Sequence, residues 1–363
     1  MNSVKTKVAI VGTNGIPARY GGYETLAEYL TKHLSGEFDF TVYCSKAQPQ
    51  LHKNFNGSKL IYFPLGANGW QSIFYDFFTL FHAAFKSDVI LYLGPGAGYI
   101  VPFLKIFRKR IIVNHGGLNE WEREKYSGFQ RFVAKMGHKY GALFANFNIA
   151  DNNLLKESIK KTFGVDSLVI RYGGDHAVKI DVENDLLAKY PFLNKKFFIN
   201  VSRAQVDNNL HLVLEAFETT PDKTLVMVSN WSFSNYGIEL KKKYNNKYPN
   251  IIILEAVYEP KEINAIRGNA YAYIHSHSYC GTSPSLVEAM SLGLSIISFD
   301  VPTNRETTLN KAFFFKNVKE LSDLIMLNNY EDLAINGKNM KRIAENEYTW
   351  SSISSKYADL FRF

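Results

Sequence analysis

The stretch His277-Ser-Tyr-Cys-Gly-Thr-Ser-Pro-Ser-Leu-Val-Glu-Ala-Met-Ser-Leu-Gly293 decides the fold, because it joins a tight turn to the start of a helix. The apolar run 270–274 before it is typical of a buried strand, and Pro284 of the first residue of a helix. Such a helix N-terminus presents unpaired backbone N–H groups to an anion, most often phosphate. Glu288 lies about one turn into the helix, where it can accept hydrogen bonds from hydroxyl groups beyond that anion. In the simpler alternative, residues 282–283 only cap the helix and Glu288 is solvated.

On both sides of this stretch, apolar runs of strand length alternate with helical patterns. This alternation predicts doubly wound parallel sheets, which bind ligands beyond the carboxyl ends of their strands. Residues 172–175 (Tyr-Gly-Gly-Asp) indicate a linker, after which the alternation restarts. We therefore expect an α/β protein with domains 1–172 and 173–347 facing a central cleft, and the helical segment 348–363 joining the first domain. The expected strands are 7–11, 40–45, 60–63, 89–92, 110–113, 147–150, 168–170, 196–202, 224–229, 251–254, 270–274 and 295–299.

The amino-acid composition limits which classes of protein the chain can belong to. The chain has 363 residues, of which 46% are hydrophobic, and no apolar run reaches the roughly 18 residues of a membrane span. Residues 1–7 lack the apolar segment of a signal peptide, so we expect a cytoplasmic protein. Residues 1–172 hold 21 Lys+Arg and 12 Asp+Glu, or +9, and the remainder holds 21 and 22, or −1, which together give the total of +8. A basic half favours phosphorylated substrates or an anionic membrane, and the lack of a zinc-finger pattern or Arg-rich tract disfavours nucleic acid.

The two cysteines, Cys44 and Cys280, lie far apart in the sequence. We recognise no His or Cys at ligand spacing around them. The expectation is two free thiols, no disulfide and no metal site.

A glycine-rich segment, Gly12-Thr-Asn-Gly-Ile-Pro-Ala-Arg-Tyr-Gly-Gly-Tyr-Glu24, separates the first strand from the first helix. Its four glycines predict tight turns or the close approach of another group. The spacing is G-x-x-G rather than G-x-G-x-x-G, and the second strand ends in Tyr-Cys-Ser without an acidic residue. A nicotinamide-dependent dehydrogenase is therefore disfavoured.

Two strand ends carry candidate catalytic residues. His115 follows the strand 110–113 beside two glycines and is expected to face the cleft, unless the backbone satisfies it as a loop histidine. Asp151 follows the strand 147–150, although an aspartate directly before a helix is usually an N-cap.

Two segments of the first half combine aromatic and basic residues. Residues 70–85 (WQSIFYDFFTLFHAAF) contain eight aromatic or histidine side chains and one charge, Asp76. Residues 103–110 mix aromatic residues with four cations. Together they favour a surface that rests on an anionic bilayer, and the alternative is a core helix followed by a basic loop.

Four segments together resemble the GT-B glycosyltransferases of family 4, and within them a subgroup of bacterial rhamnosyltransferases with a distinctive N-terminal domain. They are 12–25 (GTNGIPARYGGYET), 120–125 (EWxRxK, where x is any residue), 172–175 (YGGD) and 281–290 (GTSPSLVEAM). The resemblance implies two Rossmann-like domains and retaining transfer of a sugar from a nucleoside diphosphate donor to an acceptor hydroxyl, without a metal ion or a cofactor. It places the nucleotide sugar in the C-terminal domain and the acceptor in the N-terminal domain.

The resemblance also implies roles for single residues. The donor candidates are Arg203 for the diphosphate, Gly281, Thr282 and Ser283 for phosphate and sugar, Glu288 for the sugar of the nucleotide, and Asn208, Tyr258 and Cys280. The catalytic candidates are His115 near the anomeric carbon, Asp151 and Glu288. The candidates in the loop that meets the phosphates and the acceptor are Gly15, Arg19, Gly21, Gly22, Glu24 and Arg171.

The chain departs from the family pattern at two of these positions. Cys280 stands where the family has the first of two glutamates eight positions apart, and a thiol is a poor acceptor for sugar hydroxyls. We therefore expect a donor sugar that lacks the hydroxyl gripped there. Asn208 stands where the family has a phosphate-binding lysine. Neutralisation of the diphosphate then falls on Arg203, on helix dipoles, and on Arg171 or Arg19.

The resemblance, together with the basic and aromatic first half of the chain, predicts a rhamnosyltransferase that uses dTDP-L-rhamnose and a lipid-linked saccharide acceptor. We expect it to associate peripherally with the inner face of the cell membrane and to build a cell-surface polysaccharide such as a capsule. The alternative within family 4 uses UDP-glucose, UDP-galactose or UDP-N-acetylglucosamine. The alternatives of another class are a sugar-nucleotide epimerase, which acts without an acceptor, and an inactive binding module.

Overall fold

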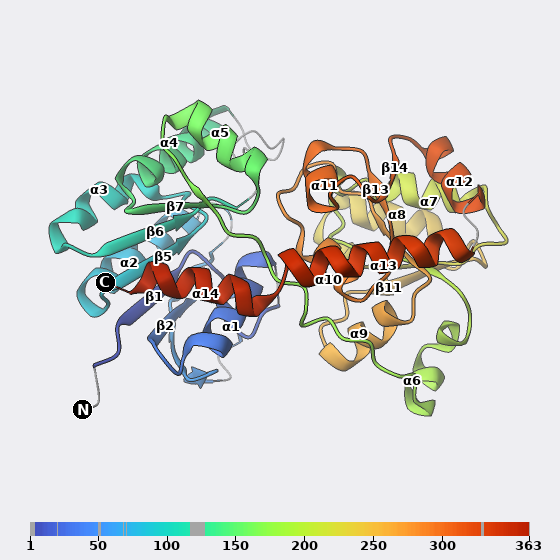
Figure 1. Ribbon diagram of the computed structural model, residues 1–363, viewed down its shortest axis with the longest axis horizontal. Coiled ribbons are helices and arrows are strands. Elements are labelled where there is room, and N and C mark those ends of the chain that lie inside the picture. Colours follow the sequence, from blue (N-terminus) through green and yellow to red (C-terminus); the bar gives the residue numbers. More distant parts are fainter. Residues whose placement is uncertain are drawn as a thin grey trace. The chain divides into compact units, whose positions relative to one another are not determined.

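The computed structural model describes residues 4–19, 21–49, 52–67, 69, 71–116, 128–327 and 330–362. The chain divides into two compact units (Figure 1). Unit 1 comprises Met1–Tyr172 together with Trp350–Phe363, and unit 2 comprises Gly173–Thr349. The segment 120–125, which contributes to the family resemblance, lies outside the described residues.

Unit 1 is built on an eight-stranded sheet within the described residues, in the order β3-β4-β2-β1-β5-β6-β7-β8. All neighbouring strands are parallel except the pair β3 and β4. The strands are β1 (Lys7–Val11), β2 (Asp39–Cys44), β3 (Asn54–Phe55), β4 (Ser58–Tyr62), β5 (Val89–Leu93), β6 (Arg110–Asn114), β7 (Phe147–Ala150) and β8 (Leu168–Val169). The helices are α1 (Gly22–Leu34), α2 (Gln71–Lys86), α3 (Val101–Leu104), α4 (Gly128–Phe144), α5 (Asn153–Phe163) and α14 (Trp350–Phe361).

The central strand β1 shows how the sheet of unit 1 is covered on both faces. Successive side chains of a strand point to opposite faces. Val8 and Ile10 therefore join one core, which contains residues of α1 and α14, whereas Ala9 and Val11 join a second core with α2 and α3. Figure 1 shows α14 beside α1 within this unit. Burial on both faces explains why these strands are continuous apolar runs.

Unit 2 is built on a six-stranded parallel sheet in the order β11-β10-β9-β12-β13-β14 within the described residues. Its faces are buried in two cores, one with α9, α10 and α13 and the other with α7, α8 and α12. The strands are β9 (Phe198–Val201), β10 (Leu225–Ser229), β11 (Ile251–Glu255), β12 (Ala272–His275), β13 (Ser295–Phe299) and β14 (Phe313–Phe315). The helices are α6 (Asn184–Lys189), α7 (Leu210–Glu218), α8 (Asn235–Tyr244), α9 (Pro260–Gly268), α10 (Pro284–Ser291), α11 (Pro302–Thr307), α12 (Val318–Leu327) and α13 (Tyr330–Glu347).

The structure also differs from the pattern of the sequence in places. The segment 99–107, for which the apolar pattern indicates one helix, consists of three short pieces, the 3₁₀ turn η1 (Gly98–Ile100), α3 and the 3₁₀ turn η2 (Lys105–Phe107). The run ends at Arg108, whose backbone is left-handed, a conformation that terminates helices. The edge strands β3 and β14 were not expected, because runs of two and three residues carry too little periodicity.

Candidate active site

The loop between β12 and α10 lies at the carboxyl end of a central strand of unit 2, as the sequence predicts. Helix α10 begins at Pro284, in agreement with the expected position of that proline. Ser283 occupies the N-cap position, but its side chain does not cap the helix, and its hydroxyl lies 3.2 Å from that of Ser285. The interpretation of Ser283 as a side-chain cap is therefore wrong.

Glu288 of α10 is buried rather than solvated, since its exposed fraction is 9%. One carboxylate oxygen accepts a hydrogen bond from His176 Nε2 at 3.0 Å, and the other pairs with the guanidinium of Arg267 at the end of α9. Burial lowers the pKa of Arg267 to about 10, which leaves this side chain charged at neutral pH. The alternative of a solvated Glu288 is thus contradicted, and the carboxylate is fixed by two partners from other segments.

The start of the β12–α10 loop is tied to the loop after β9. Ser276 donates a hydrogen bond to the carbonyl of Asn208 at 2.5 Å, and the buried side chain of Asn208 donates to the carbonyl of Arg203 at 2.7 Å. The structure thus brings together two of the predicted donor residues, Arg203 and Asn208. The Asn208 amide acts here on the backbone.

Three side chains with metal-ligating atoms meet in the same loop. His275, the last residue of β12, lies with His277 and Cys280 so that one ligand atom from each falls within 4.8 Å of the others. Burial lowers the pKa of His275 to about 3, so its imidazole is neutral. The expectation that Cys280 has no histidine at ligand spacing is therefore wrong, because the pattern His-x-His-x-x-Cys closes into a cluster.

The glycine-rich loop of unit 1 closes around a buried glutamate. Glu24, in the first turn of α1, is 3% exposed. Its Oε1 accepts hydrogen bonds from the Thr13 hydroxyl at 2.9 Å, from the Asn14 backbone N–H at 2.7 Å and from the Asn14 side chain at 3.2 Å. Glu24 therefore fixes the path of its own loop.

Two glycines of this loop are required by close packing within unit 1. Gly12 has a φ of +83°, and a Cβ there would clash with the carbonyl oxygen of Leu93. Gly15 has a φ of +113°, and a Cβ would lie 2.5 Å from Cys44 Sγ. Gly12 and Gly15 are thus needed because the loop packs closely against β5 and β2. Gly21 and Gly22, at the start of α1, have no positive φ.

His115 follows β6 and is 1% exposed. Its Nε2 donates to Asn148 Oδ1 at 2.9 Å, since the Asn148 amide group itself donates to Ala142, and its Nδ1 lies 3.4 Å from Nδ1 of His138. Burial lowers the pKa of His115 to about 4, although the hydrogen bond with Asn148 opposes this shift. His115 is thus a neutral side chain at pH 7, and its role near the anomeric carbon stays a prediction.

Asp151 lies at the end of β7 and is 2% exposed. The residue that caps α5 is Asn152, whose side chain accepts a hydrogen bond from the Leu155 backbone N–H at 2.7 Å. The capping interpretation of Asp151 is therefore wrong. Its catalytic role stays a prediction.

The remaining candidates occupy more open positions. Arg19 is exposed, Arg171 is half-buried, and Tyr258 is 61% exposed in the segment between β11 and α9. The pattern analysis missed Arg267 and His176, because no local spacing marks a residue that reaches a partner from another helix or a linker. The spacing His-x-His-x-x-Cys is present in the sequence, but it was not recognised as a possible ligand set for His275 and His277.

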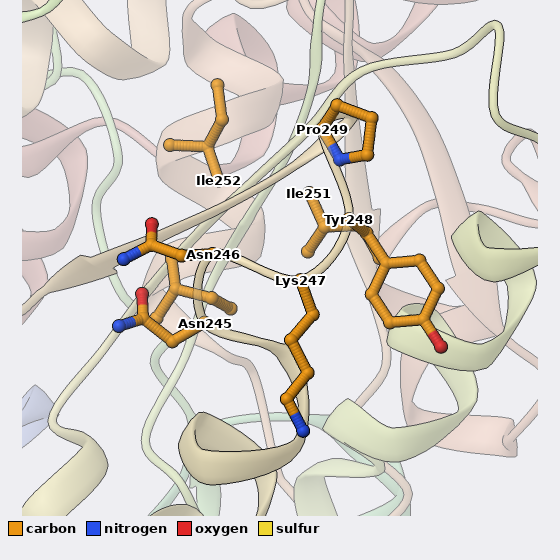
Figure 2. Close-up of a pocket in the computed structure, with 8 residues that line it drawn as sticks. Asn245, Asn246, Lys247, Tyr248, Pro249, Ile251 and Ile252 are labelled. Atoms are coloured by element: carbon orange, nitrogen blue, oxygen red, sulfur yellow. The ribbon is translucent and has the colours of Figure 1, made fainter.

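A separate pocket of about 400 Å³ lies at the amino end of β11 (Figure 2). It is lined by Asn245, Asn246, Lys247, Tyr248, Pro249, Ile251, Ile252 and Ile253. Strand β11 is the edge of its sheet, and this pocket is at the strand end opposite to the carboxyl ends, where α/β sheets bind ligands. It is not part of the candidate site.

Helix α2 of unit 1 has two different faces. One face packs on the sheet and includes Tyr75 and Leu80. On the other face, five phenylalanines are between 44% and 59% exposed, and Phe107 of η2 extends this group through ring contacts with Phe81 and Phe85. We call this surface the Phe face; its exposed apolar residues are Phe74, Phe77, Phe78, Phe81, Phe85, Phe103 and Ile106.

The second half of the chain matches a known family. The model described as "Glycosyl transferases group 1" matches residues 183–350. Unit 2 is a group 1 glycosyltransferase domain. Residues 5–175 match the model described as "Domain of unknown function (DUF1972)". No curated protein matches the chain in sequence.

Solved structures support the two-domain fold of the chain. The chain is similar to sucrose-phosphate synthase from Thermosynechococcus elongatus, with a TM-score of 0.80, 15% identity and coverage of 99% of this chain and 98% of that chain. It is also similar to HepE from Anabaena in complex with UDP and glucose, with a TM-score of 0.76, 15% identity and 98% coverage of both chains. A glycosyltransferase from Rickettsia africae gives a TM-score of 0.72 at 14% identity, with 98% coverage of both chains. The predicted fold class, two Rossmann-like α/β domains of the GT-B type, is confirmed. Within the described parts of the chain, no helix combines the length and apolarity needed to span a bilayer.

Proposed function

We propose that this chain is a retaining, metal-independent glycosyltransferase in which unit 2 holds a nucleoside diphosphate sugar. The observation that carries the proposal is the β12–α10 loop of a group 1 glycosyltransferase domain, which ends in a helix N-terminus without a side-chain cap. Backbone N–H groups and the helix dipole favour the negative charge that develops on the β-phosphate when the donor bond breaks. Arg203 adds a guanidinium after β9, and the leaving phosphate accepts the proton of the acceptor hydroxyl.

Glu288 receives the sugar of the nucleotide in this proposal. Arg267 and His176 each engage one of its oxygens, and an ionised carboxylate has about four acceptor sites in total. Its oxygens therefore retain acceptor capacity for a hydroxyl of the nucleotide's pentose while their direction is fixed. Pre-orientation of this kind reduces the entropy lost when the donor binds.

For the donor we propose dTDP-L-rhamnose. Cys280 supports this choice, because a thiol where the resembled family has a carboxylate suits a sugar with fewer hydroxyls to hold. A UDP-sugar is the second candidate, and it is favoured by the complex of HepE, a protein of similar fold, with UDP and glucose.

The donor is tested by thermal stabilisation of the full chain with dTDP, UDP and GDP at equal concentrations, because a ligand that binds only the folded state raises its stability. The largest shift with dTDP supports the rhamnosyl donor, and the largest shift with UDP replaces it by the second candidate. Glu288→Gln should lower kcat/KM about 10-fold to 100-fold through weaker hydrogen bonds to the donor. Glu239→Gln, an exposed residue of α8, is the matched control.

A turnover assay with the donor, with and without an acceptor, separates the classes of function. Product formed from the donor alone would favour a sugar-nucleotide epimerase, and nucleotide binding without turnover on any lipid-linked acceptor would favour an inactive module. Failure of all three nucleotides to stabilise the chain would overturn the proposal.

For the acceptor we propose a lipid-linked saccharide, reached by docking of the Phe face on the anionic inner surface of the cell membrane. An exposed apolar group of this size is unusual on a protein surface that meets only water. Cations flank it, since Lys86 and Arg108 are exposed and Lys105 and Lys109 are half-buried. Aromatic residues that enter the interface together with cations that meet anionic headgroups are the signature of peripheral binding.

Membrane docking is tested by co-sedimentation with vesicles of phosphatidylcholine alone or mixed with phosphatidylglycerol. The double variant Phe81→Ser/Phe85→Ser should bind the mixed vesicles about tenfold more weakly, because each ring loses part of its transfer free energy. Phe233→Ser, which removes a ring that is 47% exposed in unit 2, should bind like the wild type. Equal binding to both vesicle types, or an equal loss in the control, would contradict the docking surface.

A further inference from the structure

The cluster of His275, His277 and Cys280 supplies no step of the glycosyl transfer proposed above, although Cys280 also bears on the choice of donor sugar. It lies where β12 gives way to the loop, and the ring centroids of the two histidines are 4.3 Å apart. One ligand atom from each of the three residues lies within 4.8 Å of the other two. Two imidazoles and a thiol are the donor set of borderline and soft metal ions.

His275 is the strongest indication that the cluster binds something. Its side chain is fully buried, with 0% exposed, and neither ring nitrogen has a hydrogen-bond partner. A buried polar group without a partner is destabilising, so native proteins rarely keep one without a reason. A bound cation would satisfy one of these nitrogens and would direct the ring towards the loop.

The surroundings hold the other two ligands in place. Asn304 of α11 is fully buried, and its side-chain N–H donates to the carbonyl of His277 at 3.0 Å. Its side-chain oxygen lies 3.6 Å from Cys280 Sγ. One asparagine thus contacts both loop residues and fixes the loop backbone at His277.

We propose that His275, His277 and Cys280 form a three-ligand site for a divalent cation of the zinc type. Ligand atoms at about 2.0–2.3 Å from a tetrahedral ion lie about 3.4–3.8 Å apart, so the present spacing closes by small side-chain rotations. Binding converts the thiol into a thiolate, with release of one proton to solvent. The fourth position is left to water or to an anion.

The position of the three ligands determines how a bound cation would affect the β12–α10 loop. The cation would link the end of β12 to the residue before Gly281, and so fix the loop that precedes the N-terminus of α10. No step of sugar transfer is routed through the ion, and the inference stands whether or not the proposed donor is correct.

The site is tested on the full chain after removal of any affinity tag and treatment with a chelating resin. Zn²⁺ is then added, excess is removed by desalting, and zinc per chain is measured by atomic mass spectrometry. One zinc per chain and a higher melting temperature are expected. In a parallel titration, Co²⁺ should give the intense visible bands of tetrahedral coordination and a thiolate charge-transfer band.

Variants assign the ligands. His277→Ala and Cys280→Ser change half-exposed residues, and each should weaken zinc binding about tenfold or more. Cys280→Ser should also abolish the thiolate band. Cys44→Ala removes the other thiol, and His33→Ala removes an exposed histidine of unit 1; both should leave binding and spectrum unchanged.

Each outcome decides the proposal. Substoichiometric zinc in the wild type, an octahedral cobalt spectrum, or a thiolate band that survives Cys280→Ser would overturn it. If one variant does not fold, as judged by circular dichroism, the other variant and the wild-type cobalt spectrum still decide. Nucleotide-induced stabilisation, measured on the metal-free chain, separates failure of this site from failure of the proposed function.

Discussion

The two loops that the sequence singled out have the same plan but different internal partners. Each connects a central parallel strand to a helix, and each contains a buried glutamate near the helix start. Glu24 is satisfied by neutral donors of its own loop, Thr13 and Asn14. Glu288 is instead held by Arg267 from another helix and by His176 from the segment after the linker.

This difference shows two uses of one residue type. A carboxylate that collects donors from its own loop fixes a backbone path, and substrate contacts then come from the backbone that it shapes. A carboxylate held by side chains of distant segments keeps a fixed direction while its own loop stays available for a ligand. The family resemblance treats both glutamates as site residues, but the contacts give them separate tasks.

The largest expected effect is that of removing the cation that pairs with Glu288. Arg267→Ala should lower the free energy of unfolding by about 3–5 kcal/mol, because it leaves a buried carboxylate without its charge partner. Denaturant unfolding followed by circular dichroism measures this. Arg305→Ala breaks the more exposed pair with Asp300 and should cost about 1 kcal/mol or less. Equal costs for the two variants would remove the distinction drawn for Glu288.

The corresponding change in the first loop should cost somewhat less. Glu24→Ala leaves the buried donors of Thr13 and Asn14 without an acceptor and should lower the free energy of unfolding by about 3 kcal/mol. Glu24→Gln keeps an acceptor oxygen and should recover part of that loss. If the glutamine variant is as unstable as the alanine variant, negative charge rather than acceptor geometry organises the loop.

A smaller change in the free energy of unfolding is expected to distinguish Gly15 from Gly21 in the same loop. Gly15→Ala should lower the free energy of unfolding by about 2 kcal/mol, because it combines a positive φ with a Cβ that meets Cys44. Gly21→Ala is the control, since φ is −166° and the nearest atom is Glu24 Oε2 at 3.5 Å. Comparison of the two melting temperatures tests this, and equal shifts would contradict the packing argument.

The last expected effect is a slope in the pH dependence of stability, caused by a third buried carboxyl. Burial raises the pKa of Asp76 to about 7, although a hydrogen bond from the Tyr92 hydroxyl opposes the shift. Between about pH 4 and pH 7 the native state keeps a proton that the unfolded chain, with a pKa of about 3.9, has released. Asp76 therefore makes stability fall as the pH rises through this window. In Asp76→Asn the difference in unfolding free energy between about pH 5 and pH 7 should be less negative, and parallel profiles would contradict the assignment.

The sequence predicted the fold well because its strands are buried on both faces. The runs 7–11 and 295–299 coincide with β1 and β13, since a central parallel strand requires apolar side chains in succession. The sequence also predicted the start of α10 at Pro284 correctly. Residues 54–55 and 313–315 form edge strands whose pairing depends on neighbours, so their own pattern does not mark them.

The candidate site was less predictable, for a physical reason. Local spacing marks the loop residues Gly281 and Ser283, but a partner such as Arg267 reaches the site only because α9 and α10 share one hydrophobic core. The cap of α5 shows the same limit on a small scale, because Asp151 and Asn152 are both good caps and only the backbone decides between them. The sugar, the acceptor and the roles of His115 and Asp151 stay predictions.

The place of α14 in unit 1 has a consequence for how the protein is made. Trp350, Ile353, Tyr357 and Phe361 belong to the core that covers β1, although all of unit 2 precedes them in the chain. A ribosome therefore releases the last piece of this core only after it has synthesised unit 2. Until then the apolar face under α14 stays uncovered, and the side-chain N–H of Asn114 lacks the Tyr357 hydroxyl as its acceptor. Unit 2 can complete its core first during synthesis, and the unit that begins the chain finishes last.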